Sequence, residues 1–306
     1  MGTQARLFFT NGPPGLERVL LDRLTELERR WSRFLTDSEI NAINAAAGTP
    51  VTVSTDTQLL VQRAISASQR TRGWFDPTLL NELVEAGYNQ TFEQLPTHGL
   101  GQMVITVHRS ADGDQVRLHD WNALSSSIVT DPVGGSVMVP SGVGIDPGGI
   151  GKGLGADILL QLALESGASA AMVDLGGDLV MGGRAPAAGW PVAIEDPFDR
   201  KRPAVEIRLD WGAVATSSRS RRRWVDEGAE RNHLIDPSTG TSTDSDVAAC
   251  TVIGAECWLA ESYAKAAVLA GRQAGLQMLE EDGLEGLLFG VDGSVHQTSG
   301  MEQFTA

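Results

Sequence analysis

A glycine-rich segment near the middle of the chain limits most strongly what this sequence can fold into. The segment GIDPGGIGKGLGAD, residues 144–157, holds five glycines in its first ten positions and runs into an apolar helical pattern. Glycines at this density let a backbone approach a ligand closely and aim N–H groups at it. The segment is neither a P-loop, which needs GxxxxGK followed by Ser or Thr, nor a GxGxxG dinucleotide fingerprint. Its glycine content favours a tight strand-to-helix corner and a phosphate site equally.

Helix and strand patterns are mixed around this segment without a regular βαβ alternation. Apolar spacing predicts helices within 13–34 and 54–73, with Asp37 or Ser38 capping a short helix between them. Short strands are predicted at 1–10, 102–108, 114–120, 125–130, 170–183, 190–196, 204–210, 212–218, 221–227, 247–254 and 284–298. We therefore expect an α+β fold. Because no linker or repeat interrupts the pattern, residues 1–306 are predicted to form a single domain of two interleaved lobes.

Composition narrows the partners of this domain. The net charge of -15 argues against binding to nucleic acids or anionic membranes, which need basic surfaces. No apolar run reaches the ~18 residues of a membrane-spanning helix, and the first residues lack a secretory pattern. A cytoplasmic location is therefore expected. The two cysteines, Cys250 and Cys257, are too few for a disulfide framework and lack a zinc-binding pattern.

Three further segments carry polar groups suited to a site. Gly176 and Gly177 precede Asp178, and a simple turn is the favoured interpretation. The hydroxyls at 216–218 end a predicted strand, and His233 follows shortly before an Asp-Pro pair. A lone histidine is more often a structural hydrogen bonder than a catalyst. The dense basic run consists of Arg219, Arg221, Arg222 and Arg223, for which a solvated strand face is slightly favoured.

The helical segment CWLAESYAKAAVLAG, residues 257–271, carries one acid and one base four residues apart. Glu261 and Lys265 therefore share one helix face. Considered alone, the pair is typical of a solvated ion pair that stabilises a helix by a few tenths of a kcal/mol.

Short motifs follow one another along almost the whole chain. They are MGT (1–3), SEINAIN (38–44), FDPT (75–78), IDPGGIGKG (145–153), VDLGGD (173–178), WPVAIEDP (190–197), ATSS (215–218) and HLIDPSTG (233–240). Each is weak alone, but in this order they resemble the FAD:protein FMN transferase family, the ApbE-like flavin transferases. The resemblance implies a compact, T-fold-like α+β unit with a flavin-nucleotide cleft between its lobes.

The resemblance also implies a reaction. Members of the family bind FAD and Mg²⁺ and transfer FMN onto a Thr or Ser hydroxyl of a client protein, releasing AMP. Catalysis of such a phosphoryl transfer consists mainly of positioning and of neutralising the developing charge. FAD and a client flavoprotein are thus the implied partners, and the sequence does not define an oligomeric state.

Site residues follow from the resemblance, motif by motif. His233, Lys152 and Asp178 are the implied catalytic residues, with His233 handling the proton of the client hydroxyl. The implied FAD-binding residues are Met1, Gly2, Thr3, Glu39, Asp76, Gly148, Gly149, Ile150, Lys152, Asp178, Thr216, Ser217, Ser218, His233 and Lys265.

One departure from the family concerns the metal. Family members hold Mg²⁺ with an Asp and a Thr four residues apart on one helix, plus a backbone carbonyl from the glycine-rich loop. Here these positions are Glu261, Lys265 and Gly151. A protonated Lys has three donors and no acceptor, so it cannot ligate a metal. Two hypotheses follow: either Lys265 replaces the metal and binding is metal-independent, or the chain is an FAD-binding relative without transferase activity.

Overall fold

The computed structural model describes all of residues 1–306 except 1–3, 92–94, 96–121, 200, 227 and 306. The strands predicted at 102–108 and 114–120 lie outside the described residues, as do Met1, Gly2 and Thr3. Helices and antiparallel strands are mixed in the described part, which confirms the α+β prediction. No helix among the described residues is long and apolar enough to cross a membrane.

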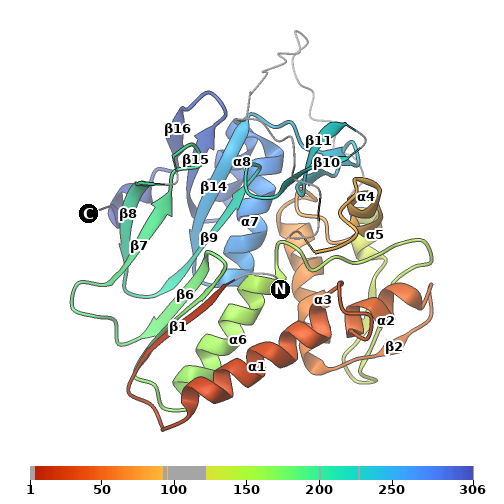
Figure 1. Cartoon of the computed structure of the whole chain (residues 1–306), viewed down its shortest axis with the longest axis horizontal. Coiled ribbons are helices and arrows are strands. Elements are labelled where there is room, and N and C mark those ends of the chain that lie inside the picture. Colours follow the sequence, from red (N-terminus) through yellow and green to blue (C-terminus); the bar gives the residue numbers. More distant parts are fainter. Residues whose placement is uncertain (1–3, 92–94, 96–121, 200, 227, 306) are drawn as a thin grey trace.

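A seven-stranded sheet forms the centre of the protein (Figure 1). Its order is β1-β5-β6-β9-β14-β15-β16, and every neighbouring pair is antiparallel. The strands are β1 (Ala5–Thr10), β5 (Ala170–Leu175), β6 (Asp178–Gly183), β9 (Gly212–Ser218), β14 (Val247–Gly254), β15 (Glu285–Gly290) and β16 (Val295–Gln297). The hairpins predicted within 170–183 and 284–298 are confirmed by the pairing of β5 with β6 and of β15 with β16.

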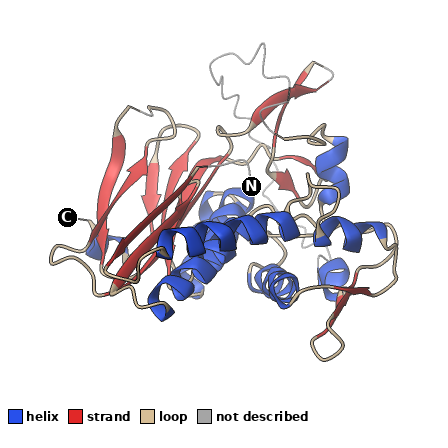
Figure 2. Cartoon of the chain, turned by 60° about the horizontal axis from the view of Figure 1, so that its bottom comes forward, coloured by secondary structure: helices blue, strands red, loops and turns tan. Residues whose placement is uncertain are grey.

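Alternate residues of the sheet face two different layers, as the pleat of a strand requires. In β9, Ala213 and Ala215 join a core with the helices, whereas Val214 faces a second core on the other side. Helices cover one face of the sheet and a strand hairpin covers the other (Figure 2). The helical layer consists of α1 (Leu16–Trp31), α6 (Gly151–Glu165), α7 (Cys257–Ala270) and α8 (Arg272–Glu281). The layer on the other face consists of β7 (Trp190–Glu195), β8 (Pro203–Leu209) and η2 (Met301–Phe304).

A smaller, mainly helical lobe completes the fold. Its elements are α2 (Glu39–Ala45), α3 (Thr55–Arg70), α4 (Leu80–Glu85), α5 (Asn122–Ser126), β2 (Val51–Thr52), β3 (Val129–Asp131) and β4 (Ser136–Met138). Ser38 and Ser54 cap α2 and α3 by accepting the backbone N–H three residues on, as predicted. The strand predicted at 125–130 is wrong in its first half, where α5 ends, because Ser125 is buried against Ser68 of α3.

Two short hairpins lie beside this lobe. They are β10 (Arg223–Asp226) with β11 (Ala229–Asn232), and β12 (Ile235–Asp236) with β13 (Thr241–Ser242). Trp224 of β10 is buried and donates its indole N–H to the carbonyl of Ala86, 2.7 Å away. The hairpins are thereby fixed against the helical lobe.

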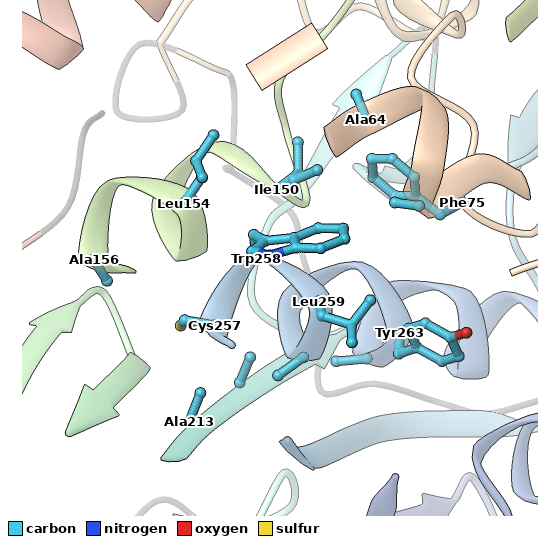
Figure 3. Close-up of a cluster of buried hydrophobic side chains, with 14 of the residues drawn as sticks. Ala64, Phe75, Ile150, Leu154, Ala156, Ala213, Cys257, Trp258, Leu259 and Tyr263 are labelled. Carbon is cyan, nitrogen blue, oxygen red and sulfur yellow. The ribbon is translucent and has the colours of Figure 1, made fainter. Parts of the chain in front are cut away.

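One hydrophobic core joins the helical layer of the sheet to the smaller lobe. Trp258, at the start of α7, belongs to this core, and its ring lies on the side of α7 where Ile150, Leu154 and the helix that carries Ala64 are found (Figure 3). Its side chain is 2% exposed. Burial of such large side chains contributes most of the stabilisation of a core. The first turns of α6 and α7 are therefore held rigidly between the two lobes.

Candidate functional site

A cavity of about 680 Å³ opens where the glycine-rich segment, the central sheet and the smaller lobe meet. This volume lies in the range of about 300–1,000 Å³ that is usual for ligand sites. Most of the residues predicted for the site line it. They are Gly148, Gly149, Gly151, Lys152, Asp178, Thr216, Ser217, Ser218, His233, Glu261 and Lys265. Segments far apart in the sequence thus converge on one cavity.

Three predicted residues do not line this cavity. Glu39 accepts hydrogen bonds from the backbone and hydroxyl of Ser54, at 3.1 and 2.7 Å, at the start of α3. Asp76 is buried and accepts the N–H and the hydroxyl of Thr78. Ile150 is fully buried in the core.

The two helices that frame the cavity cap each other. Asp157 of α6 accepts the N–H groups of Cys257 and Trp258, both at 2.9 Å, at the start of α7. Glu261 of α7 accepts the N–H of Gly153, 2.7 Å away, in the first turn of α6. A Cβ on Gly153 would lie 2.4 Å from the carbonyl oxygen of Cys257, so only glycine permits this approach. The glycine-rich segment therefore forms a close helix contact as well as a cavity wall.

Lys152 forms the centre of a buried ion triad. Its Nζ donates to the carboxylates of Asp178, at the start of β6, and of Glu261. Burial lowers the pKa of Lys152, but the two carboxylates outweigh it and raise the pKa above its ordinary value. The ammonium is protonated, and two carboxylates contact it, so the triad has no spare positive charge.

Lys265 has a different environment, although it lies one helical turn after Glu261. The prediction of a solvated ion pair between Glu261 and Lys265 is wrong. Both residues are buried, with 2% and 7% exposed, and their hydrogen bonds go to other partners. Within the described residues, Lys265 forms no ion pair, and its Nζ donates to the carbonyl of Gly148 at 3.3 Å. Burial lowers the pKa of Lys265, while Asp146, Asp76 and Glu261 oppose this shift.

His233 lines the cavity beside β12 with one ring nitrogen free. Its Nδ1 is buried without a hydrogen-bond partner among the described residues. Burial, and next the guanidinium of Arg222, hold the pKa of His233 well below its ordinary value of 6.5. The imidazole is therefore neutral near pH 7 and is able to accept a proton.

The hydroxyl run at the end of β9 and the arginine run after it also reach the cavity. Thr216 donates its backbone N–H to Asp178 at 3.4 Å, which links β9 to the ion triad. Arg221 and Arg222 precede β10 and line the cavity, and Arg221 is solvated as predicted, with 53% of its side chain exposed. Arg223 instead pairs with Glu230 across the β10–β11 hairpin.

The sequence did not indicate an aromatic and cationic wall on the side of the smaller lobe. Arg33 lies over the rings of Phe34 and Tyr88, 4.3 and 4.5 Å from their centroids. It also pairs with Asp146 at 3.2 Å. Asp146 was detectable, because it stands inside the motif IDPGG, whereas Arg33 has no spacing signal. Phe75 is fully buried in the core, whereas Tyr88 is buried and also lines the cavity.

The contacts of the implied metal ligands do not fit Mg²⁺. One oxygen of Glu261 accepts from Lys152 and the other from Gly153, so each oxygen already has a donor and one of the donors is a cation. Lys265 supplies donors and a positive charge where a metal needs an acceptor. In the described part of the chain, no group of three or more His, Cys, Asp or Glu side chains is placed to hold a metal ion.

Fold and cavity together define a class of protein: an α+β unit whose buried cations, glycine-rich loop and neutral histidine surround a nucleotide-sized cleft. The family follows from sequence. The model of the ApbE family matches residues 1–288, and the chain belongs to this family. The resemblance stated from the motifs is thereby confirmed.

Individual relatives agree with this assignment. A FAD:protein FMN transferase of Vibrio cholerae is 28% identical over 267 residues, covering 85% of this chain and 75% of that protein. One of Treponema pallidum is 26% identical over 320 residues, covering 98% and 85%. The crystal structure of the ApbE protein from Thermotoga maritima has a TM-score of 0.82 at 25% identity, covering 100% of this chain and 96% of that one. The flavin transferase ApbE from Vibrio cholerae shares the fold with a TM-score of 0.77 at 23% identity, covering 99% and 96%.

Proposed function

We propose that this chain is an FAD:protein FMN transferase that moves FMN from FAD onto a Thr or Ser hydroxyl of a client protein and releases AMP. The single observation that supports it best is the convergence of the family motifs on one cavity. The names of the relatives from Vibrio cholerae and Treponema pallidum agree with this activity. A cytoplasmic location stays a prediction.

The reaction exchanges one bond to phosphorus for another. The client oxygen forms a bond to the phosphorus of the FMN half, and the bond from this phosphorus to the bridging oxygen breaks, so AMP leaves with that oxygen. The proton of the client hydroxyl passes to the imidazole of His233, which lines the cavity and is neutral near pH 7. A positioned base of this kind contributes about 10²–10⁴-fold to a rate.

The wall around the diphosphate has a division of roles. The loop at Gly148 and Gly149 approaches the ligand with its backbone, and the start of α6 directs its positive end at the same region. Thr216, Ser217 and Ser218 offer hydroxyls to the phosphate or flavin. The ion triad of Lys152 holds these walls at a fixed separation.

Mass spectrometry tests this proposal directly. The purified chain is incubated with FAD and a client domain that carries the acceptor motif of the family, roughly Asp-Gly-x-Thr-Gly, and AMP release is followed by chromatography. We expect the client to gain the mass of FMN less one water, with one AMP released per transfer. Tight binding of FAD with neither product would reject the proposal and favour a flavin-binding relative without transferase activity.

A matched pair of variants tests the role of His233. His233→Gln is expected to lower the transfer rate by about 10²–10⁴-fold, with little change in FAD affinity. His296→Gln is the control, because His296 is bonded to Arg272 and Ser294 and does not line the cavity. An equal rate for both variants would remove His233 from the reaction.

A further inference from the structure

Lys265 is a buried lysine that contacts no carboxylate among the described residues. Its side chain lies on the face of α7 that lines the cavity, 5.5 Å from the centroid of the Phe75 ring. Of the three donors of an ammonium, one is used, toward the carbonyl of Gly148. A buried charge is costly unless it is paired and hydrogen-bonded.

The acids around Lys265 are engaged elsewhere. Asp146 pairs with Arg33, Asp76 accepts from Thr78, and Glu261 accepts from Lys152 and Gly153. None of them lies within the 4.0 Å of an ion pair with Lys265 in the described part of the chain. Their fields favour the protonated amine without neutralising it by contact. Lys265 lines the cavity, and its only hydrogen bond to the described residues is the one to the carbonyl of Gly148.

The surroundings of Lys265 favour an anion over a metal. Six Lys and Arg side chains and five Asp and Glu side chains line the cavity, although the chain as a whole carries a net charge of -15. The chain holds three lysines, Lys152, Lys201 and Lys265, and two of them lie here. A Cβ on Gly149 would lie 2.8 Å from Cδ of Lys265, so the glycine-rich loop rests directly on this side chain.

We propose that Lys265 is the diphosphate-binding cation of this cleft and takes the place of a divalent metal, so that FAD binds without Mg²⁺. This inference rests on the proposed function for the identity of the ligand. The ammonium contacts the diphosphate oxygens with the donors that Gly148 leaves free. A fixed ammonium supplies one positive charge, and the start of α6 adds the partial charge of a helix N-terminus. Lys152 offers no spare positive charge to a ligand, because the carboxylates of Asp178 and Glu261 both contact its ammonium.

Calorimetric titration with FAD, and separately with ADP, tests the inference with EDTA and with millimolar MgCl₂. ADP is included because it carries the diphosphate without the flavin. We expect the dissociation constant of the wild-type chain for either ligand to be the same with EDTA and with Mg²⁺, because no coupling between metal and ligand is then present. A clear gain in affinity on adding Mg²⁺ would overturn the inference.

Variants separate a binding role of Lys265 from a structural one. Lys265→Met keeps the aliphatic stem and removes the charge, and it should weaken the binding of FAD and ADP about 10- to 100-fold in EDTA. Lys201→Met makes the same change at an exposed lysine outside this cavity and should leave both affinities unchanged. Lys265→Met should melt at the same or a higher temperature than the wild type, because an unpaired buried charge is removed. An unchanged affinity in a folded Lys265→Met variant would overturn the inference.

A second variant shows what the lysine replaces. Lys265→Thr supplies a hydroxyl oxygen in place of the ammonium, and it should bind both ligands more weakly than the wild type in EDTA. If it binds as tightly as the wild type in EDTA, Lys265 is not the diphosphate cation.

The outcomes keep this inference apart from the proposed function. Transfer of FMN together with a strict need for Mg²⁺ would leave the function standing and remove the role of Lys265. If ADP binds without Mg²⁺ and this binding depends on Lys265, but no FMN is transferred, the role of Lys265 stands and the proposed function fails. If neither FAD nor ADP binds, both proposals fail.

Discussion

Two lysines that line one cleft, Lys152 partly buried and Lys265 buried, show how differently the same side chain is used. Lys152, at the start of α6, contacts two carboxylates, whereas Lys265, in the middle of α7, contacts one backbone carbonyl. Both line the same cavity. Burial alone therefore does not separate a structural ion from a ligand-binding one, and the nearest acids decide the difference. We assign Lys152 to the framework of the cleft and Lys265 to its ligand.

The framework side of the cleft is closed by mutual contacts. Glu261 completes the first turn of α6, Asp157 completes the first turn of α7, and Lys152 links both helices to Asp178 of β6. On the Lys265 side, α7 is linked to the glycine-rich loop by the single hydrogen bond of Lys265 to the carbonyl of Gly148. Three predictions test whether this contrast is real, and they follow from the largest expected effect to the smallest.

Lys152→Met should have the largest effect, and it should act on stability. The change leaves Asp178 and Glu261, whose side chains are 4% and 3% exposed, without their cation. Removing one partner of a buried ion pair costs about 3–5 kcal/mol, so the free energy of unfolding should fall by about that amount. Urea denaturation followed by circular dichroism measures it.

Lys265→Met provides the matched comparison for this first prediction. It removes a lysine of the same cavity that has no carboxylate partner among the described residues. Its free energy of unfolding should stay within about 1 kcal/mol of the wild type, or rise. Equal losses in the two variants would show that the two lysines have the same role, and the contrast between framework and ligand would fall.

Much of the fold was predictable, because its signals are local. The caps at Ser38 and Ser54, the hairpins of the sheet and the helix after the glycine-rich loop depend on neighbouring residues. The strand expected at 125–130 shows the limit. Its serines and apolar residues fit a strand, but Ser125 is taken into a helix that packs on α3, and this contact is 57 residues away in sequence.

The site was predictable in its members and not in their pairings. Lys152, Asp178 and Glu261 were all selected, but the i,i+4 spacing pointed to an ion pair of Glu261 with Lys265. The structure pairs Glu261 with Lys152, which is 109 residues earlier. Spacing along a helix describes which residues share a face, and it carries no information about a cation from another helix. Arg33 was missed for the same reason, since its partner Asp146 lies far away in sequence.

Asp157→Ala should have the second-largest effect, because both sides of the cleft depend on where α7 begins. The change removes the acceptor of the N–H groups of Cys257 and Trp258. Loss of a helix cap costs about 0.5–2 kcal/mol, and we expect the upper part of this range at a buried cap. Thermal unfolding monitored by calorimetry measures the change.

Asp157→Asn is the control for this cap, since it keeps one oxygen acceptor and should lose less. Burial raises the pKa of Asp157 to about 7, against the opposing pull of the Cys257 and Trp258 N–H groups. The stability that this group contributes is therefore present at low pH and is lost as the pH rises through about 7. The Asn variant should lack this loss. If the stability of the wild type rises relative to that of Asp157→Asn as the pH increases from about 4 to about 7, the role of Asp157 as a buried cap with a raised pKa is contradicted.

The smallest effect concerns the pH dependence of transfer. It tests how the cations around His233, among them Lys265, set the pKa of this residue. Burial, then Arg222, then Lys265 and Lys152 hold the pKa of His233 below 6.5. The rate of transfer by a neutral His233 should stay constant as the pH falls to 6.5 and should decline only below this pH. The stability that the neutral ring contributes is likewise present above pH 6.5 and is lost below it. Arg222→Gln removes the charge that lowers the pKa of His233 most, so the decline in rate should move to higher pH. Lys265→Met should move it in the same direction by a smaller amount. Rates of AMP release measured across this pH range under saturating FAD test the order, and a wild-type decline that already begins above pH 6.5 would show that His233 is not the group that takes the proton.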